Sequence, residues 1–128
     1  MEQLSVRSQR QQDLVDITAA VQRLAAGWPC QAVLVYVPHT TAGVLINEHA
    51  DPDVARDMLV ALDRMVPSDG IYRHAEGNSP AHVKTTLVGT SQIVPVSNGQ
   101  LALGTWQGIF LAEFDGPRVR TVLISPLG

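Results

Sequence analysis

The sequence is poor in cysteine, in lysine and in long apolar runs. Cys30 is the one cysteine, so no disulfide can form within the chain, and a reducing compartment such as the cytoplasm is expected. Lys84 is the one lysine, and the arginines are scattered, which leaves no basic stripe for nucleic acid. No apolar run reaches the about 18 residues of a membrane span, and the polar N-terminus lacks a signal-peptide core. The composition therefore predicts a cytoplasmic protein that binds neither nucleic acid nor membrane.

Well-known catalytic motifs are also missing. There is no GxxxxGK[ST] phosphate loop, no GxGxxG after a strand and no GxSxG nucleophile turn, which removes support for classical nucleotide-binding and serine-hydrolase functions. What the chain does have is 128 residues that are 45% hydrophobic, enough to bury a core without disulfides or a structural metal. We expect one domain that covers residues 1–128.

Capping residues and apolar periodicity predict three helices among short strands. Helices are predicted behind Asp16, behind Asp51-Pro52 and from Pro80 to about Val88, and they end at Gly27, Pro67 and Gly89. Strands are predicted at residues 4–7, 32–37, 44–46, 93–96, 101–103, 109–114 and 119–124. Because most of the strands follow one another through short turns, we predict a compact α+β domain with mostly antiparallel sheets and the helices grouped on one side.

Three local features sharpen this prediction. The continuously apolar run 32–37 is typical of a strand buried on both faces. Asn98-Gly99 is the signature of a tight hairpin, and Asp115-Gly116-Pro117 predicts the turn of a second hairpin between the last two strands. Glu113 and the residues after it are expected to form a charged, solvated turn.

Three of the four histidines lie in polar, turn-rich segments. His39 follows the predicted core strand, and His74 and His82 flank a loop that leads into the third helix. Three imidazoles from the ends of separate elements can form a catalytic metal site with one open position, and the positive end of a helix favours a neutral His82. The spacing matches no established metal motif, so the alternative is that these histidines cap turns. His49 is more typical of a surface residue.

Other polar residues are candidates for the same site. Glu48, at the end of a strand, would act as a general base or hold a histidine, and a solvated strand end is the alternative. Asn78 and Glu76, inside the histidine loop, would orient an imidazole. Gln107 follows Trp106 between two glycines and would contact a substrate, whereas Trp106 is more typical of core or interface packing.

Taken together, these motifs resemble the YjbQ family over about Leu4 to Ile124. The matching motifs are Pro38–Ala42, Asn47-Glu48, Asp51–Val54, His74 with Asn78 and Ala81-His82, Leu101–Gln107 and Asp115–Arg118. The resemblance implies an α+β fold that assembles as a homotrimer, with a histidine-lined site at the subunit boundaries. It also implies that His39, His74 and His82 bind a divalent metal ion, either zinc or magnesium.

The activity that the resemblance implies is secondary thiamine-phosphate synthesis. In this reaction hydroxymethylpyrimidine diphosphate is coupled to thiazole phosphate, with release of pyrophosphate, as a main or a side activity. A diphosphate leaving group needs cations, and Lys84 and Arg118 are the candidates for contacting phosphate.

Three functional hypotheses follow from the residues and the resemblance. The first is a small metal-assisted enzyme of the YjbQ type, in which Glu48 is the acid or base and Asn78 and Gln107 orient the substrate. The second is a trimeric binding module for a phosphorylated metabolite or anion. The third is a metal-dependent hydrolase of another substrate class.

Overall fold

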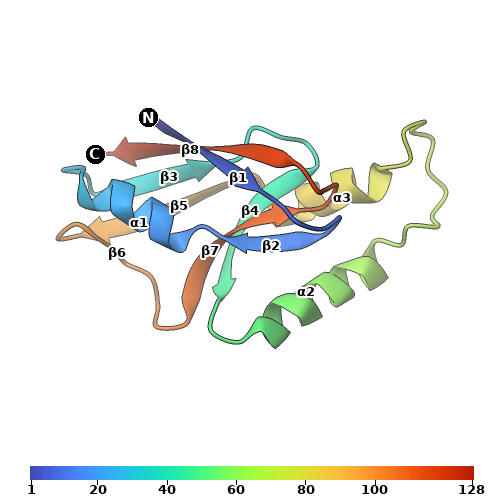
Figure 1. The fold of residues 1–128 in the computed structure, drawn as a ribbon, viewed down its shortest axis with the longest axis horizontal. Coiled ribbons are helices and arrows are strands. Elements are labelled where there is room, and N and C mark those ends of the chain that lie inside the picture. The colour runs from blue at the N-terminus through green and yellow to red at the C-terminus, as the bar shows by residue number, and fades with distance from the viewer.

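The chain folds into two antiparallel sheets with three helices, as a computed structural model that describes all residues 1–128 shows (Figure 1). The five-stranded sheet has the order β1-β8-β3-β5-β6, and the three-stranded sheet has the order β2-β7-β4. The strands are β1 (Glu2–Arg7), β2 (Asp13–Asp16), β3 (Ala32–Tyr36), β4 (Ala42–Glu48), β5 (Ser91–Ser97), β6 (Gln100–Leu101), β7 (Gln107–Glu113) and β8 (Val119–Leu127). The helices are α1 (Thr18–Ala26), α2 (Pro52–Met65) and α3 (Ser79–Val88). The predicted α+β class with antiparallel sheets is confirmed.

The main core lies between the two sheets and under α1. It is a cluster of 14 buried apolar residues that includes Val33 and Val35 of β3, Leu111 of β7 and Val21 of α1. Alternate residues of β7 face the other way, where Ala112, together with Phe114 just beyond the strand, belongs to a smaller cluster that partly buried leucines of α2 help to cover. Since side chains alternate along a strand, β7 can serve both clusters at once.

Strand β7, and not β3, is the strand buried on both faces. Every residue of β7 after Gln107 is buried, whereas β3 alternates between buried Val33 and Val35 and more exposed neighbours. The prediction for residues 32–37 was therefore wrong about burial, because the outer face of the five-stranded sheet is left uncovered. Tyr36, for example, is 42% exposed.

The two predicted hairpins have different outcomes. Asn98 and Gly99 both have positive φ angles, 54° and 74°, and they join β5 to β6 as the turn chemistry requires. β7 and β8 do not pair with each other. β7 lies between β2 and β4, and β8 lies between β1 and β3, so Asp115-Gly116-Pro117 connects two sheets instead of two strands of a hairpin.

Strand β2 had no counterpart among the predicted strands. It occupies residues 13–16, which means that Asp16 ends a strand, and the first helix begins at Thr18. The Asp16 carboxylate still accepts the Thr18 backbone N–H at 2.9 Å. The third helix begins at Ser79, with Asn78 and not Ser79 at its N-cap position.

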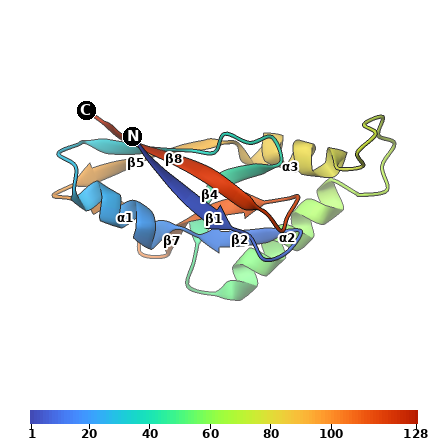
Figure 2. The ribbon, with the colours of Figure 1, turned by 45° about the horizontal axis from the view of Figure 1, so that its top comes forward.

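Helix α2 lies on the outside of the molecule, beyond β2 and joined to α3 by the long loop 66–78 (Figures 1 and 2). Asp51 caps it through the Asp53 N–H at 2.9 Å, with Pro52 in the first turn, as predicted. None of its residues is buried, although its apolar residues fall on one stripe. No helix of the chain combines the length and the apolar character that a membrane crossing requires.

Candidate functional site

His39 and His82 line one cavity of about 430 Å³ between the end of β3 and helix α3. The rest of the lining consists of threonines and one glycine: Thr40, Thr85, Thr86, Gly89 and Thr90. We call this space the histidine cavity. It contains no carboxylate and no apolar side chain, so its walls offer imidazole nitrogens and hydroxyl groups to a ligand.

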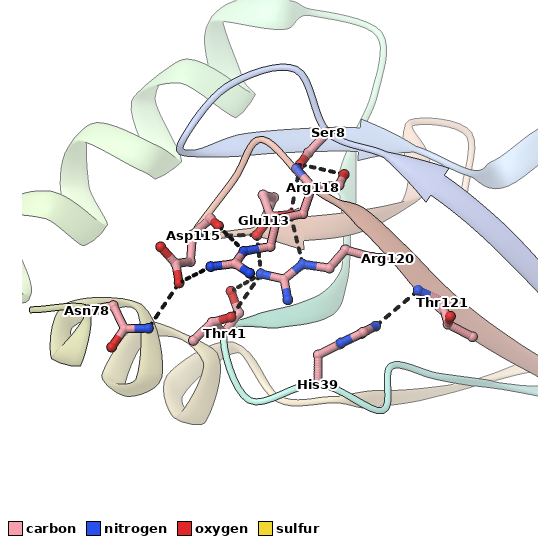
Figure 3. Close-up of polar contacts among 9 residues, drawn as sticks. All are labelled: Ser8, His39, Thr41, Asn78, Glu113, Asp115, Arg118, Arg120 and Thr121. Atoms are coloured by element: carbon pink, nitrogen blue, oxygen red, sulfur yellow. Dashed lines mark hydrogen bonds and ion pairs between the residues drawn. The ribbon is translucent and has the colours of Figure 1, made fainter. Parts of the chain in front are cut away.

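His39 is held in place by the strand ladder that it interrupts. The pairing of β3 with β8 ends before Pro38, which has no backbone N–H to donate. Beyond this point the His39 side chain bonds to β8 in place of the backbone, because its Nε2 accepts the backbone N–H of Thr121 at 3.0 Å (Figure 3). A ring nitrogen that accepts a backbone N–H carries no proton, so in the neutral ring Nδ1 carries the proton and can donate a hydrogen bond to a ligand.

The His39 imidazole is poised in its neutral form. Partial burial lowers its pKa below the usual value, and the nearby Arg120 guanidinium lowers this pKa further, while Glu113 opposes the effect. In this neutral form the one lone pair of the ring is taken up by the Thr121 N–H, and Nδ1–H faces a ligand as a hydrogen-bond donor.

A buried ion pair lies behind His39. The Arg120 Nε donates to Glu113 Oε1 at 2.8 Å, and Arg120 Nη2 donates to Glu113 Oε2 and to the Thr41 hydroxyl (Figure 3). Ser8 and the Asp115 backbone N–H donate to the same carboxylate at 2.8 and 3.0 Å. Glu113 is fully buried, which by itself raises its pKa, but these hydrogen bonds prevail and lower it. The expectation of a solvated turn at Glu113 was therefore wrong.

His74 is placed beside His82 by the loop that precedes α3. The two rings meet edge to face, with their centroids 5.4 Å apart, and His74 Nε2 lies 3.9 Å from a Glu76 carboxylate oxygen. With zinc–nitrogen bonds of about 2.0 Å, two imidazoles on one tetrahedral ion have ring centres about 5 Å apart. The separation of this pair is thus compatible with a shared ion.

A complete ligand set is not assembled within one chain. No group of three His, Cys, Asp or Glu side chains lies close enough together to hold a metal ion. His39 faces the same cavity as His82, but it does not complete a cluster with the other two histidines. The donor set therefore fits a metal only if further ligands come from a substrate, from water or from a second copy of the chain.

The other predicted site residues fall in two further places. Asn78 and Lys84 line a separate cavity of about 640 Å³. Lys84 is buried there, and its Nζ donates to Gln12 and to Asp63, so its charge is already matched by a carboxylate. Arg118 is paired with Asp115 at 3.0 Å. Neither cation faces the histidine cavity.

Glu48 and Gln107 lie at the opposite end of β4 from His39. They are paired in register across β4 and β7, and Glu48 lies six positions after Ala42, the start of β4 (48 − 42), a distance of about 20 Å. The Gln107 side-chain oxygen accepts the Gly104 N–H at 2.8 Å in a local turn. In a single chain these two residues do not reach the histidine cavity.

The threonine lining was not anticipated from the sequence. Thr85 is 4% exposed, and its hydroxyl has no hydrogen-bond partner, whereas the neighbouring Thr86 hydroxyl donates to the His82 carbonyl oxygen at 3.0 Å. A helical threonine usually satisfies itself on its own helix backbone, as Thr86 does. The pattern Thr85-Thr86 near the end of a helix is the signal that could have pointed to this face.

These features define a small antiparallel α+β protein with a cavity lined by histidine and threonine. The family model described as "UPF0047 protein YjbQ-like" matches residues 2–128, and the chain belongs to this family. UPF0047 protein YugU of Bacillus subtilis is 48% identical over 128 residues, which cover 98% of this chain and 97% of YugU. A UPF0047 protein of Methanocaldococcus jannaschii is 43% identical, with 96% and 91% of the two chains covered.

Solved structures show the same fold. A crystal structure of a YjbQ/UPF0047 protein from Clostridium acetobutylicum has a TM-score of 0.96 at 46% identity and covers 99% of this chain and 100% of its own. A YbjQ-like protein from Sulfolobus solfataricus has a TM-score of 0.94 at 34% identity, with 99% and 95% covered. The first is described as uncharacterized and the second as of unknown function.

The comparisons correct the activity that the resemblance implied. The relatives are named only as UPF0047 or YjbQ-like proteins, and nothing among them supports thiamine-phosphate synthesis. That prediction was therefore wrong as a conclusion from family membership. The function of this chain has to be inferred from its own residues.

Proposed function

We propose that the histidine cavity is a divalent-metal site of a small enzyme that acts on a small anionic substrate at a boundary between subunits of a homotrimer. The observation behind this proposal is that His39 and His82, 43 positions apart in the chain (82 − 39), line one cavity, with the His74 ring packed against His82. Neutral imidazoles brought together from separate elements are typical of metal and acid–base sites.

The charge of the surroundings favours an anionic substrate, including a phosphorylated one. The cavity lining has no carboxylate that would repel an anion. The Arg120 guanidinium behind His39 adds no net charge, because Glu113 is paired with it. Hydroxyl groups of the lining threonines can donate hydrogen bonds to anionic oxygens.

The chain's own residues support roles for the three histidines. His39 Nδ1–H would donate a hydrogen bond to the substrate, and the His74 and His82 rings would hold a divalent ion between them. A divalent ion bound there would polarise a substrate oxygen and lower the pKa of a coordinated water.

The surface near the cavity supports assembly with a second copy. Val83 and Leu87 of α3 are 41% and 55% exposed, four residues apart on one side of the helix. Tyr36 and Ile93 are diagonal neighbours on the uncovered face of the large sheet, and Ile93 is 62% exposed. Apolar residues this exposed next to a polar cavity are typical of a subunit boundary.

A second copy would also explain the distant candidates. Glu48, Gln107 and the 63% exposed Trp106 lie together at the far end of β4 and can reach only the histidine cavity of another chain. Under this proposal each site combines histidines from one subunit with Glu48 and Gln107 from its neighbour.

Metal content is the first test. Protein purified without an affinity tag is analysed for bound metals, alongside His74→Ala, His82→Ala and the control His49→Ala. His49 pairs with Asp16 at 2.9 Å, away from the cavity, so its removal should leave the metal content unchanged. We expect the first two variants to lose the metal. Full metal content in both of them would refute the ligand assignment.

Assembly and catalysis are tested separately. Light scattering should give three times the chain mass for the native protein and a smaller species for Leu87→Glu, which places a charge in the apolar patch. A monomer at micromolar concentration would refute the trimer. Metal-loaded protein is then screened with phosphate-ester and carboxylate substrates, and thermal stabilisation by a substrate without turnover would identify a binding module in place of an enzyme.

A further inference from the structure

A second cavity, separate from the histidine cavity, opens on another face of α3. Its volume is about 640 Å³, within the range of small-molecule sites, and it shares no lining residue with the histidine cavity. It lies between the loop after β1, the end of α2, the loop before α3 and the segment after β7. Only two of its 12 lining residues, Ala81 and Phe114, are hydrophobic.

The one cation in this cavity is already paired. Lys84 is 5% exposed, and its Nζ donates to Gln12 Oε1 at 2.7 Å and to Asp63 Oδ1. The hydrogen bond from Lys84 lowers the pKa of Asp63, although partial burial of that carboxylate opposes the effect. A ligand therefore meets a neutral ion pair at this wall and not an open positive charge.

Hydrogen-bond acceptors at the opposite wall lack donors. Asn78 Nδ2 donates to Asp115 Oδ2 at 3.0 Å, while Asn78 Oδ1 is buried and has no partner (Figure 3). The amide cannot be turned round, because its oxygen would then face the Asp115 carboxylate. Asp115 Oδ1 accepts no hydrogen bond in the chain, since Arg118 and Asn78 both donate to Oδ2.

The exposed Glu76 carboxylate is a third acceptor in the lining of this cavity. The Glu76 side chain lines the cavity and is 76% exposed, so its carboxylate is free to turn inward. The Glu76 carboxylate, Asp115 Oδ1 and Asn78 Oδ1 thus lack donors of their own, and with the Arg118 charge that pairs with Asp115 the group keeps a net charge of about −1. A primary ammonium group carries three N–H donors and a positive charge, which matches this set in both number and sign.

We propose that this second cavity binds the primary ammonium group of a small polar molecule, with Asp115, Glu76 and Asn78 as its acceptors. The polar lining around the acceptors suits hydroxyl or amide groups on the rest of the ligand.

Three matched probes test the role of the N–H donors. Ethanolamine has a primary ammonium, choline has the same skeleton with a quaternary ammonium, and ethylene glycol has no charge. Each is titrated into ¹⁵N-labelled protein, and backbone amide shifts are followed. We expect saturable shifts at residues 76–78 and 114–115 with ethanolamine alone. Equal shifts with choline, equal shifts with ethylene glycol, or no saturable shift would each overturn the proposal.

Two variants and a matched control test the acceptors. Asp115→Asn should weaken ethanolamine binding about tenfold, since it removes a charged hydrogen-bond acceptor. Glu76→Gln should weaken it as well, and this exposed side chain can be replaced without risk to the fold if Asp115→Asn does not fold. Asp57→Asn makes the same charge change at a 73% exposed position of α2 and should leave binding unchanged. Undiminished binding in Glu76→Gln and in folded Asp115→Asn would refute the assignment.

Discussion

Replacement of Glu113 by Gln tests the network behind His39. The substitution keeps the side-chain volume, but it leaves the buried Arg120 guanidinium without a counter-charge. Glu113 is 0% and Arg120 5% exposed, so neither group can recover its hydration in the folded protein. Removal of one partner of a buried ion pair costs about 3–5 kcal/mol. Since domains of this size are stable by about 5–15 kcal/mol, the variant should lose a large part of its stability.

Urea denaturation measures this loss, and a double-mutant cycle isolates the pair. Arg120→Met should also be strongly destabilising, because it leaves a buried carboxylate with fewer donors. The double variant Glu113→Gln/Arg120→Met should cost far less than the sum of the single variants, since no buried charge remains. Additive losses, or a loss below about 1 kcal/mol for Glu113→Gln, would refute the view that the two charges depend on each other.

The same variant reports on the histidine cavity. Glu113 raises the pKa of His39, whereas burial and Arg120 lower it. Without the carboxylate, the pKa of His39 should be lower in Glu113→Gln than in the native protein. An NMR titration of the histidine ring protons measures this shift, with His49 as the internal control. A rise of the His39 pKa in Glu113→Gln would contradict the electrostatic description of the site.

Three further predictions concern stability. Gly43→Ala should unfold or strongly destabilise the chain, because a β-carbon there would overlap the Gly89 carbonyl oxygen, and a melting temperature equal to the native one would refute this contact. The lowered pKa of His39 stabilises the folded state above the unfolded histidine pKa of about 6.5, and this contribution is lost as pH falls through the folded pKa. The urea midpoint of His39→Gln should therefore change less with pH below 6.5 than the midpoint of the native protein. An equal pH dependence in the two proteins would refute this contribution of His39. Lys84→Met removes the bond from α3 to Asp63 of α2 and should weaken the contact between these helices. The backbone amides of α2 should then exchange with solvent faster than in the native protein.

Local sequence chemistry predicted the elements well wherever a single turn of chain decides the outcome. Asp51-Pro52 starts α2, and Asn98-Gly99 forms the turn between β5 and β6, because capping and positive φ angles depend only on neighbouring residues. The short strand β2 was missed, since four residues show too little alternation to be recognised. The predicted hairpin at Asp115-Gly116-Pro117 failed because a turn sequence does not specify which strands pair on either side of it.

The site was predicted in part. The polar contexts of His39, His74 and His82 pointed to a shared function, and the fold brings His39 and His82 to one cavity with His74 beside it. Spacing could not show that Glu48 lies at the other end of β4, since distance along a strand is known only once the register is known. It could not show either that Lys84 is paired with Asp63, because that contact joins two helices.

Residue types and their order were enough to establish the class of fold, the helix starts, one turn and the group of histidines. These properties arise from interactions within a few residues. Strand pairing, the burial of Glu113 against Arg120, and the division of the polar residues between two cavities arose only in the folded chain. Each of these depends on contacts between segments that are distant in sequence, and only the packing of both sheets and α3 around the core brings those segments together.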